Sequence, residues 1–143
     1  MGNAESKDML PSVSAPTITD SLEPVLLIAA PSLDAETWRI GGTLGAIEEE
    51  RRINDLIETG GRGTGSARGR PVPQVVVYGR NGADLSAESH ARKLAKHGID
   101  AAVYRGGLLE WALLHELYGS DPYRLDDLLV GGARNCDPLD FLA

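Results

Sequence analysis

The stretch Val-Val-Val-Tyr-Gly-Arg-Asn-Gly at residues 75–82 joins a continuous apolar run to a loop bracketed by glycines. A short apolar run of this kind is typical of a strand that is buried on both faces of a parallel sheet. Similar runs occupy residues 25–30, where Pro31 ends the run, and residues 101–104. Segments with helical spacing separate them. This alternation predicts an α/β domain in three layers, a small parallel sheet with helices on both faces.

The remaining elements follow from apolar spacing, capping residues and glycine stops. They are predicted as a helical turn at 34–38 capped by Ser32 or Asp34, a short strand at 43–46, a helix from Ile47 to Gly60, a strand at 74–78, a helix at 86–98 capped by Asp84 or Ser86 and stopped by Gly98, and a helix at 106–119.

Length and composition bound the organisation of the chain. The 143 residues suffice for about one domain with a core of its own. Residues 1–24 mix Ser, Thr, Pro and charge, and we expect a flexible arm there. The domain then covers 25–119, with a Gly/Arg loop inserted at 59–73. Residues 120–143 are expected to form a C-terminal helix and a tail.

The charge balance narrows the class of partner. Fourteen basic residues stand against 21 acidic ones, a net charge of -7, which argues against nucleic acid because phosphate contacts need a basic face. The single cysteine, Cys136, suits a reducing compartment. No apolar run is long enough for a spanning helix, and the N-terminus lacks the apolar core of a secretory signal. We therefore expect a cytoplasmic protein.

The first residues, Met-Gly-Asn-Ala-Glu-Ser, fit the pattern for N-myristoylation, with Gly2 as the acceptor. A single myristoyl chain binds a bilayer with a constant of only about 10⁴ M⁻¹, so a second signal is needed for stable residence. The candidates for that second signal are three arginines in a segment without acids, Arg62, Arg68 and Arg70. A solvated linker loop explains the same segment equally well.

Three segments together resemble the rhodanese-like domain family, the single-domain sulfurtransferase fold. Residues 75–82 are similar to that family's strand and active-site loop, Tyr-Cys-Arg-x-Gly in outline. Residues 104–114, Tyr-Arg-Gly-Gly-Leu-Leu-Glu-Trp-Ala-Leu-Leu, resemble its Gly-Gly-x-x-x-Trp segment. Residues 39–47 resemble a glycine-led segment before the second helix, with Gly42 where histidine is usual. The resemblance spans roughly residues 25–118 and implies the rhodanese fold.

The departure from the family pattern falls on the reactive residue. In active members a cysteine thiolate at the floor of the loop accepts the sulfane sulfur, and this chain has Gly79 there. A phosphatase loop on the same fold also needs that cysteine. Cys136 is an alternative nucleophile, although Asp137 and Asp140 beside it would raise the pKa of its thiol. We therefore expect no catalytic residue in the loop.

The loop can still bind. A turn between a strand and a helix presents backbone N–H groups, and Arg80 adds positive charge, so an anion or a partner's carboxylate is expected at residues Gly79, Arg80, Asn81, Gly82, Ala83 and Asp84. A tight connection without a ligand is the alternative. Ser86 and His90 stand four residues apart, without a nucleophile elbow to make them a hydrolase pair. The three histidines lack ligands at zinc spacing, and no phosphate loop or dinucleotide fingerprint is present, so we expect no metal and no cofactor.

These observations predict a catalytically inactive rhodanese-like module that binds protein partners and is held at a membrane surface by its lipid. Its docking surfaces are expected on the Trp111 helix and the C-terminal tail. A lipid-tagged adaptor of this kind would suit the cell cortex, a cilium or a flagellum. The alternatives are a sulfurtransferase that uses Cys136 and a structural subunit of a larger assembly, such as an axonemal one.

Overall fold

The computed structural model describes residues 10–20, 24–58 and 73–128. Within them, four parallel strands form the central sheet, in the order β1-β5-β4-β2. The strands are β1 (Ser12–Val13), β2 (Val25–Ala29), β4 (Gln74–Tyr78) and β5 (Ala101–Tyr104). The three apolar runs thus form strands as predicted. In the register, Val75 lies between Leu26 and Ala101.

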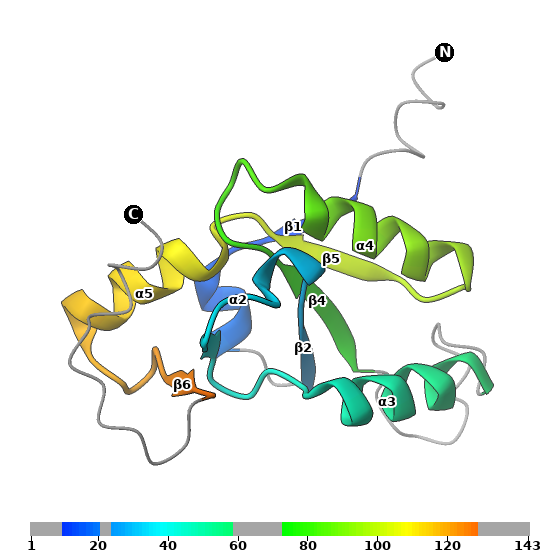
Figure 1. The fold of residues 1–143 in the computed structure, drawn as a ribbon, viewed down its shortest axis with the longest axis horizontal. Helices are drawn as coiled ribbons and strands as arrows, with labels where there is room; N and C mark the ends of the chain where they lie inside the picture. Colours follow the sequence, from blue (N-terminus) through cyan, green and yellow to red (C-terminus); the bar gives the residue numbers. More distant parts are fainter. Residues whose placement is uncertain (1–9, 21–23, 59–72, 129–143) are drawn as a thin grey trace.

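Helices cover both faces of this sheet (Figure 1). Helices α3 (Ala46–Glu58) and α4 (Leu85–Lys96) cover one face, and the short α2 (Ala15–Thr19) and α5 (Gly107–Tyr118) cover the other. Side chains of a strand alternate between faces. In β4, Val75 and Val77 therefore join the core under α3 and α4, while Val76 and Tyr78 join the core under α5. The predicted three-layer α/β architecture is confirmed.

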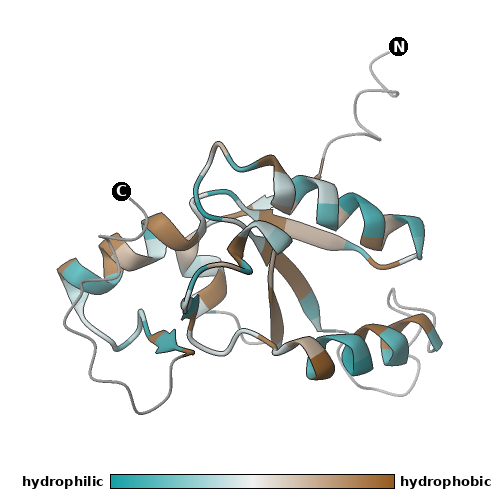
Figure 2. Ribbon diagram, in the orientation of Figure 1, coloured by the Kyte–Doolittle hydropathy of each residue, from teal (hydrophilic) through white to brown (hydrophobic). Residues whose placement is uncertain are grey.

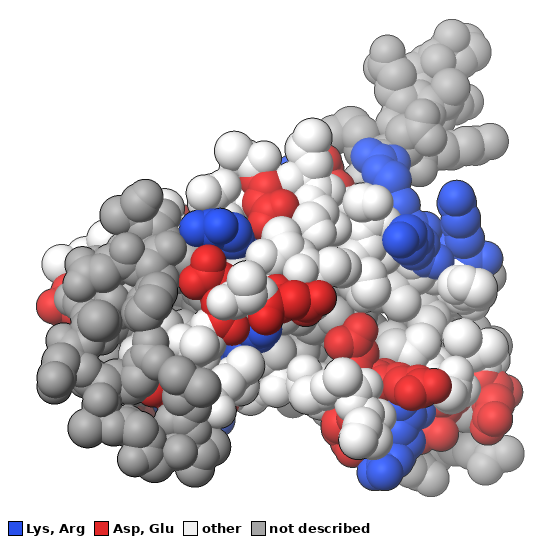
Figure 3. All heavy atoms as spheres, viewed as in Figure 1, with Lys and Arg blue, Asp and Glu red and all other residues white. Residues whose placement is uncertain are grey.

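Hydropathy follows the layers. Figure 2 shows largely brown strands at the centre, whereas α3 and α4 mix brown and teal residues. Asp84 caps the N-terminus of α4, because its side chain accepts a hydrogen bond from the backbone N–H of Ser86, as predicted. Lys93 and Lys96 lie in its last turn, where cations favour the helix dipole. Basic side chains gather over this end of α4 in Figure 3.

A second, small sheet lies beside the main one. Strand β3 (Trp38–Ile40) pairs antiparallel with β6 (Leu125–Asp127). The predicted turn at 34–38 is therefore wrong, because the 3₁₀ turn η1 comes earlier, at Pro31–Leu33, and Trp38 already belongs to a strand. The predicted C-terminal helix is absent from residues 120–128, which β6 occupies in part. Both differences arise because β3 pairs with β6, which is distant in the sequence. The residue pattern of a single segment does not reveal such a pairing.

The N-terminal and glycine-rich segments also differ from prediction. Strand β1 pairs with β5, and Ala15 in α2 is buried, so the domain begins before the boundary expected at residue 24. The strand predicted at 43–46 is reduced to one bridge between Thr43 and Leu27, because α3 already begins at Ala46. Among the described residues, no helix is long and apolar enough to cross a membrane.

Candidate functional site

The loop at residues 79–84 follows β4 at the carboxyl end of the sheet and packs against the first turn of α5. The backbone N–H groups of Leu108 and Leu109 donate to the carbonyls of Gly79 and Arg80, at 2.9 and 2.8 Å. Gly107 makes this approach possible. Its φ is +68°, and a Cβ there would lie 2.7 Å from the Gly79 oxygen. The loop is therefore clamped to the helix by backbone hydrogen bonds.

The carboxylate of Asp84 fills the inside of the loop. Its Oδ2 accepts from the backbone N–H of Arg80 at 2.8 Å and from the hydroxyl of Ser32, and its Oδ1 accepts from the N–H of Ser86 at 2.9 Å. Burial raises the pKa of Asp84, but the hydrogen bonds from Ser32, Arg80 and Ser86 outweigh burial and hold the pKa below its ordinary value. The loop thus contains an anion that belongs to the chain itself.

This carboxylate lies where a side chain at position 79 would have to go. A Cβ on Gly79 would stand 2.6 Å from Oδ2 and 2.8 Å from Cγ of Asp84, closer than van der Waals contact permits. Glycine is therefore required by the present position of Asp84. In chemical terms, position 79 offers no nucleophilic side chain, and the nearest side chain to it is the Asp84 carboxylate.

Arg80 turns away from the loop toward Glu36. Its Nη2 lies 3.5 Å from Oε2 of Glu36, whose side chain is only 11% exposed. Asn81 closes the turn, since its Oδ1 accepts from the N–H of Ala83 at 2.9 Å. Gly82 lies at the tip, where a Cβ would make an ordinary 3.4 Å contact with the Arg105 carbonyl. An external anion would therefore compete with Asp84 for the Arg80 N–H, and its binding stays a prediction.

The other candidate residues fall into two groups. The predicted lipidation residue Gly2, the arginines of the Gly/Arg loop and the alternative nucleophile lie outside the described residues: Gly2, Arg62, Arg68, Arg70 and Cys136. Ser86 and His90 contact different partners. The Ser86 hydroxyl accepts from the N–H of Ser32 at 3.3 Å, and Nε2 of His90 lies 3.4 Å from Oε2 of Glu49 on α3.

Sequence reasoning missed Ser32 and Glu36 as parts of the loop. The sequence offers Ser32 as one of two candidate caps, with Asp34, but the 3₁₀ turn has no side-chain cap and the Ser32 hydroxyl donates to Asp84. The sequence does contain a signal that could have placed these two residues at the loop. The carboxyl ends of parallel strands meet at one edge of a sheet, so the residues after β2 should face the residues after β4. Among the described residues, no three metal-ligating side chains come together.

Comparison with known proteins supports the architecture. The crystal structure of the BH2092 protein from Bacillus halodurans is similar, with a TM-score of 0.52 and 14% sequence identity over 92% of this chain and 88% of that one. At this identity the likeness concerns the fold alone. No protein-family model matches the chain, and no curated protein matches it either.

Proposed function

We propose that this protein is a catalytically inactive rhodanese-like module that binds a protein partner. The observation that carries the proposal is the Asp84 carboxylate in the space where a reactive side chain at position 79 would stand. A persulfide transfer needs a thiolate in a positive surrounding, and a fixed carboxylate gives the opposite potential. The loop accepts backbone hydrogen bonds from the first turn of α5, so it is better suited to positioning that helix than to catalysis.

The surface of α5 supports this role, although in a different way from the sequence prediction. The sequence predicts a docking surface on the helix that contains Trp111, but Trp111 itself is 3% exposed, and its indole N–H donates to the Arg124 carbonyl at 2.8 Å. The exposed apolar side chains of the helix are instead Leu113, Leu117 and Tyr118. Contacts that form on this helix therefore involve its outer face, and Trp111 is part of the core.

We further propose that a lipid on Gly2 concentrates the module at a membrane surface, in a cilium or flagellum or at the cell cortex. In this modification the Gly2 amine attacks the thioester carbon of myristoyl-coenzyme A, forming an amide and releasing the coenzyme A thiol. Support comes from the first six residues and from the arginines at 62, 68 and 70.

The absence of sulfurtransferase activity is tested by following thiocyanate formation from thiosulfate and cyanide, with an active rhodanese as the positive control. We expect no turnover by the wild-type protein. Turnover that disappears in Cys136→Ser would show that the chemistry has moved to Cys136, and the module would then be an enzyme.

The lipid and the partner are tested together in eukaryotic cells. Intact-mass spectrometry should show the acyl mass on protein that has lost Met1, and Gly2→Ala should remove that mass. Proximity labelling of the two proteins should then give partner sets that differ in membrane proteins. An unacylated wild-type protein would refute the tether and leave the binding module standing.

A further inference from the structure

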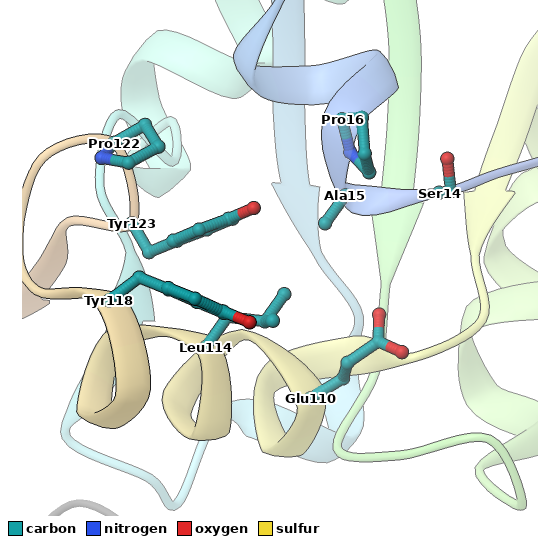
Figure 4. Close-up of a pocket in the computed structure, with 8 residues that line it drawn as sticks. All are labelled: Ser14, Ala15, Pro16, Glu110, Leu114, Tyr118, Pro122 and Tyr123. Atoms are coloured by element: carbon teal, nitrogen blue, oxygen red, sulfur yellow. The ribbon is translucent and has the colours of Figure 1, made fainter.

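A groove of about 520 Å³ opens between α5, the start of α2 and the segment before β6. Figure 4 shows the side chains that line it, among them Ala15, Pro16, Glu110, Leu114, Tyr118 and Tyr123. Its volume falls within the range of about 300–1,000 Å³ that is usual for ligand sites. The walls are mostly apolar or aromatic, and the described residues that line the groove include no lysine or arginine.

Glu110 supplies the charge in this groove, and the fold fixes its position. The phenol of Tyr104 donates to Oε1 of Glu110 at 2.6 Å. Burial and the nearby Glu110 carboxylate raise the pKa of Tyr104 well above its ordinary value, so the proton stays on the phenol. Gly106 leaves the necessary room, because a Cβ there would collide with Oε1 of Glu110. An oriented carboxylate therefore faces the groove with most of its lone pairs still available.

Tyr118 and Tyr123 form the aromatic wall of the groove. Their ring centroids are 6.1 Å apart at an interplanar angle of 45°. Tyr123 is held in place because its ring packs on Trp111 at 5.2 Å and its carbonyl accepts from Nδ1–H of His115 at 2.7 Å. Tyr118 is 66% exposed, which leaves ring surface open. In Figure 4 both phenol oxygens point the same way, toward the space between α2 and α5.

We infer that this groove binds a guanidinium group, supplied by an arginine side chain of a protein partner. A guanidinium is planar, stacks on tyrosine rings and donates two parallel hydrogen bonds to a carboxylate. Glu110 and Tyr118 both line the groove, so an arginine side chain lying in it meets a carboxylate and a tyrosine ring. The net charge of -7 also attracts a cationic partner toward the molecule. The inference rests on the proposed binding function and adds the chemistry that the module recognises.

The test is an NMR titration of the full-length ¹⁵N-labelled protein with acetyl-Ala-Arg-Ala-amide. The matched probe is the same peptide with citrulline, which keeps the shape and loses the charge. Agmatine is a third probe, because it carries the guanidinium without a peptide. We expect shifts at residues 110–123 and binding of the arginine peptide at least about tenfold tighter than binding of the citrulline peptide.

The variants separate charge and stacking from general damage. Glu110→Gln keeps an acceptor for Tyr104 and should weaken arginine binding at least about tenfold. Glu116→Gln removes the same charge from an exposed position of α5 outside the groove, and should leave binding unchanged. Tyr118→Leu should weaken binding by about two- to fivefold, whereas Tyr118→Phe should retain the stacking. Equal binding of the two peptides, or equal effects of the two glutamate variants, would overturn the inference.

Two further outcomes would assign the groove to another occupant. Tighter binding of agmatine than of the peptide would indicate a small-molecule site and overturn the protein-partner assignment. A second outcome is that the full-length Arg134→Gln variant binds the arginine peptide and the wild-type protein does not. Arg134 of the chain itself would then compete for the groove, and this also overturns the protein-partner assignment. The proposed function is tested separately, because an unoccupied groove with no sulfurtransferase activity leaves the inactive module in place.

Discussion

Placing a cysteine at position 79 should destabilise the protein because Asp84 occupies the space that the side chain needs. The backbone of Gly79 is no obstacle, since its φ is not among the positive values. The cost comes from moving the Asp84 carboxylate, which lies 2.6 Å from the new Cβ and accepts from Arg80, Ser86 and Ser32. Hydrogen bonds to charged groups contribute about 1.5–3 kcal/mol each, and solvent recovers part of this, so we expect Gly79→Cys to cost about 2–4 kcal/mol.

The assay is urea unfolding in a Cys136→Ser background with a reductant present, so that neither an internal nor an intermolecular disulfide forms. Gly82→Cys is the matched control, because its Cβ would meet only the Arg105 carbonyl at 3.4 Å, and it should cost less than about 1 kcal/mol. Asp84→Ser should cost about 2 kcal/mol and should relieve the clash.

The double variant Gly79→Cys/Asp84→Ser completes a thermodynamic cycle. Its cost should fall short of the sum of the single costs by at least about 1.5 kcal/mol, because the two side chains compete for one space. Strictly additive costs, or a Gly79→Cys variant as stable as Gly82→Cys, would refute the view that Asp84 excludes a side chain from position 79.

Three further predictions concern the loop and the core. The pKa of Asp84 is lower in the folded than in the unfolded state, so Asp84 stabilises the fold above the unfolded pKa of about 3.9 and this contribution is lost as the pH falls through the folded value. The difference in unfolding free energy between wild type and Asp84→Asn should therefore shrink between pH 6 and pH 2.5, and a constant difference would contradict the shift. Trp111→Phe removes a buried volume and the hydrogen bond to the Arg124 carbonyl, and should lower the urea-derived stability by about 2–3 kcal/mol; a loss below about 0.5 kcal/mol would place Trp111 outside the core. Deletion of residues 1–20 uncovers β5 and removes the buried Ala15, so thermal unfolding should show a loss of at least about 2 kcal/mol, against no loss if the arm were independent of the domain.

The elements of the main sheet could be predicted because each is encoded by its own residues. The run at 75–78 is apolar at every position, which suits a strand covered on both faces, and Asp84 is a good N-cap because its side chain reaches the N–H two residues on. The two-residue β1 gives no such signal. Its position depends on backbone groups of β5 that it pairs with, and those lie about 90 residues away in the chain.

In the candidate site, too, some features can be predicted from the sequence and others depend on the tertiary structure. The sequence identifies Gly79 as a position without a side chain, but it does not say what takes up the space. Only the structure brings Asp84, Ser32 and Arg80 together, because β2 and β4 are neighbours and end at the same edge. Glu110 likewise looks like an ordinary helix-surface residue until Tyr104 and Gly106 are seen to fix it at the groove.

The sequence by itself determined the α/β architecture, the loop between β4 and α4, and the absence of a thiol at position 79. Apolar periodicity, caps and glycines act over a few residues, so they can be recognised along the chain. Tertiary structure decided that the loop is filled by its own carboxylate, that Trp111 belongs to the core, and that a groove lined by Glu110 opens beside α5. These features depend on which strands and helices become neighbours, and that is settled by packing the whole chain.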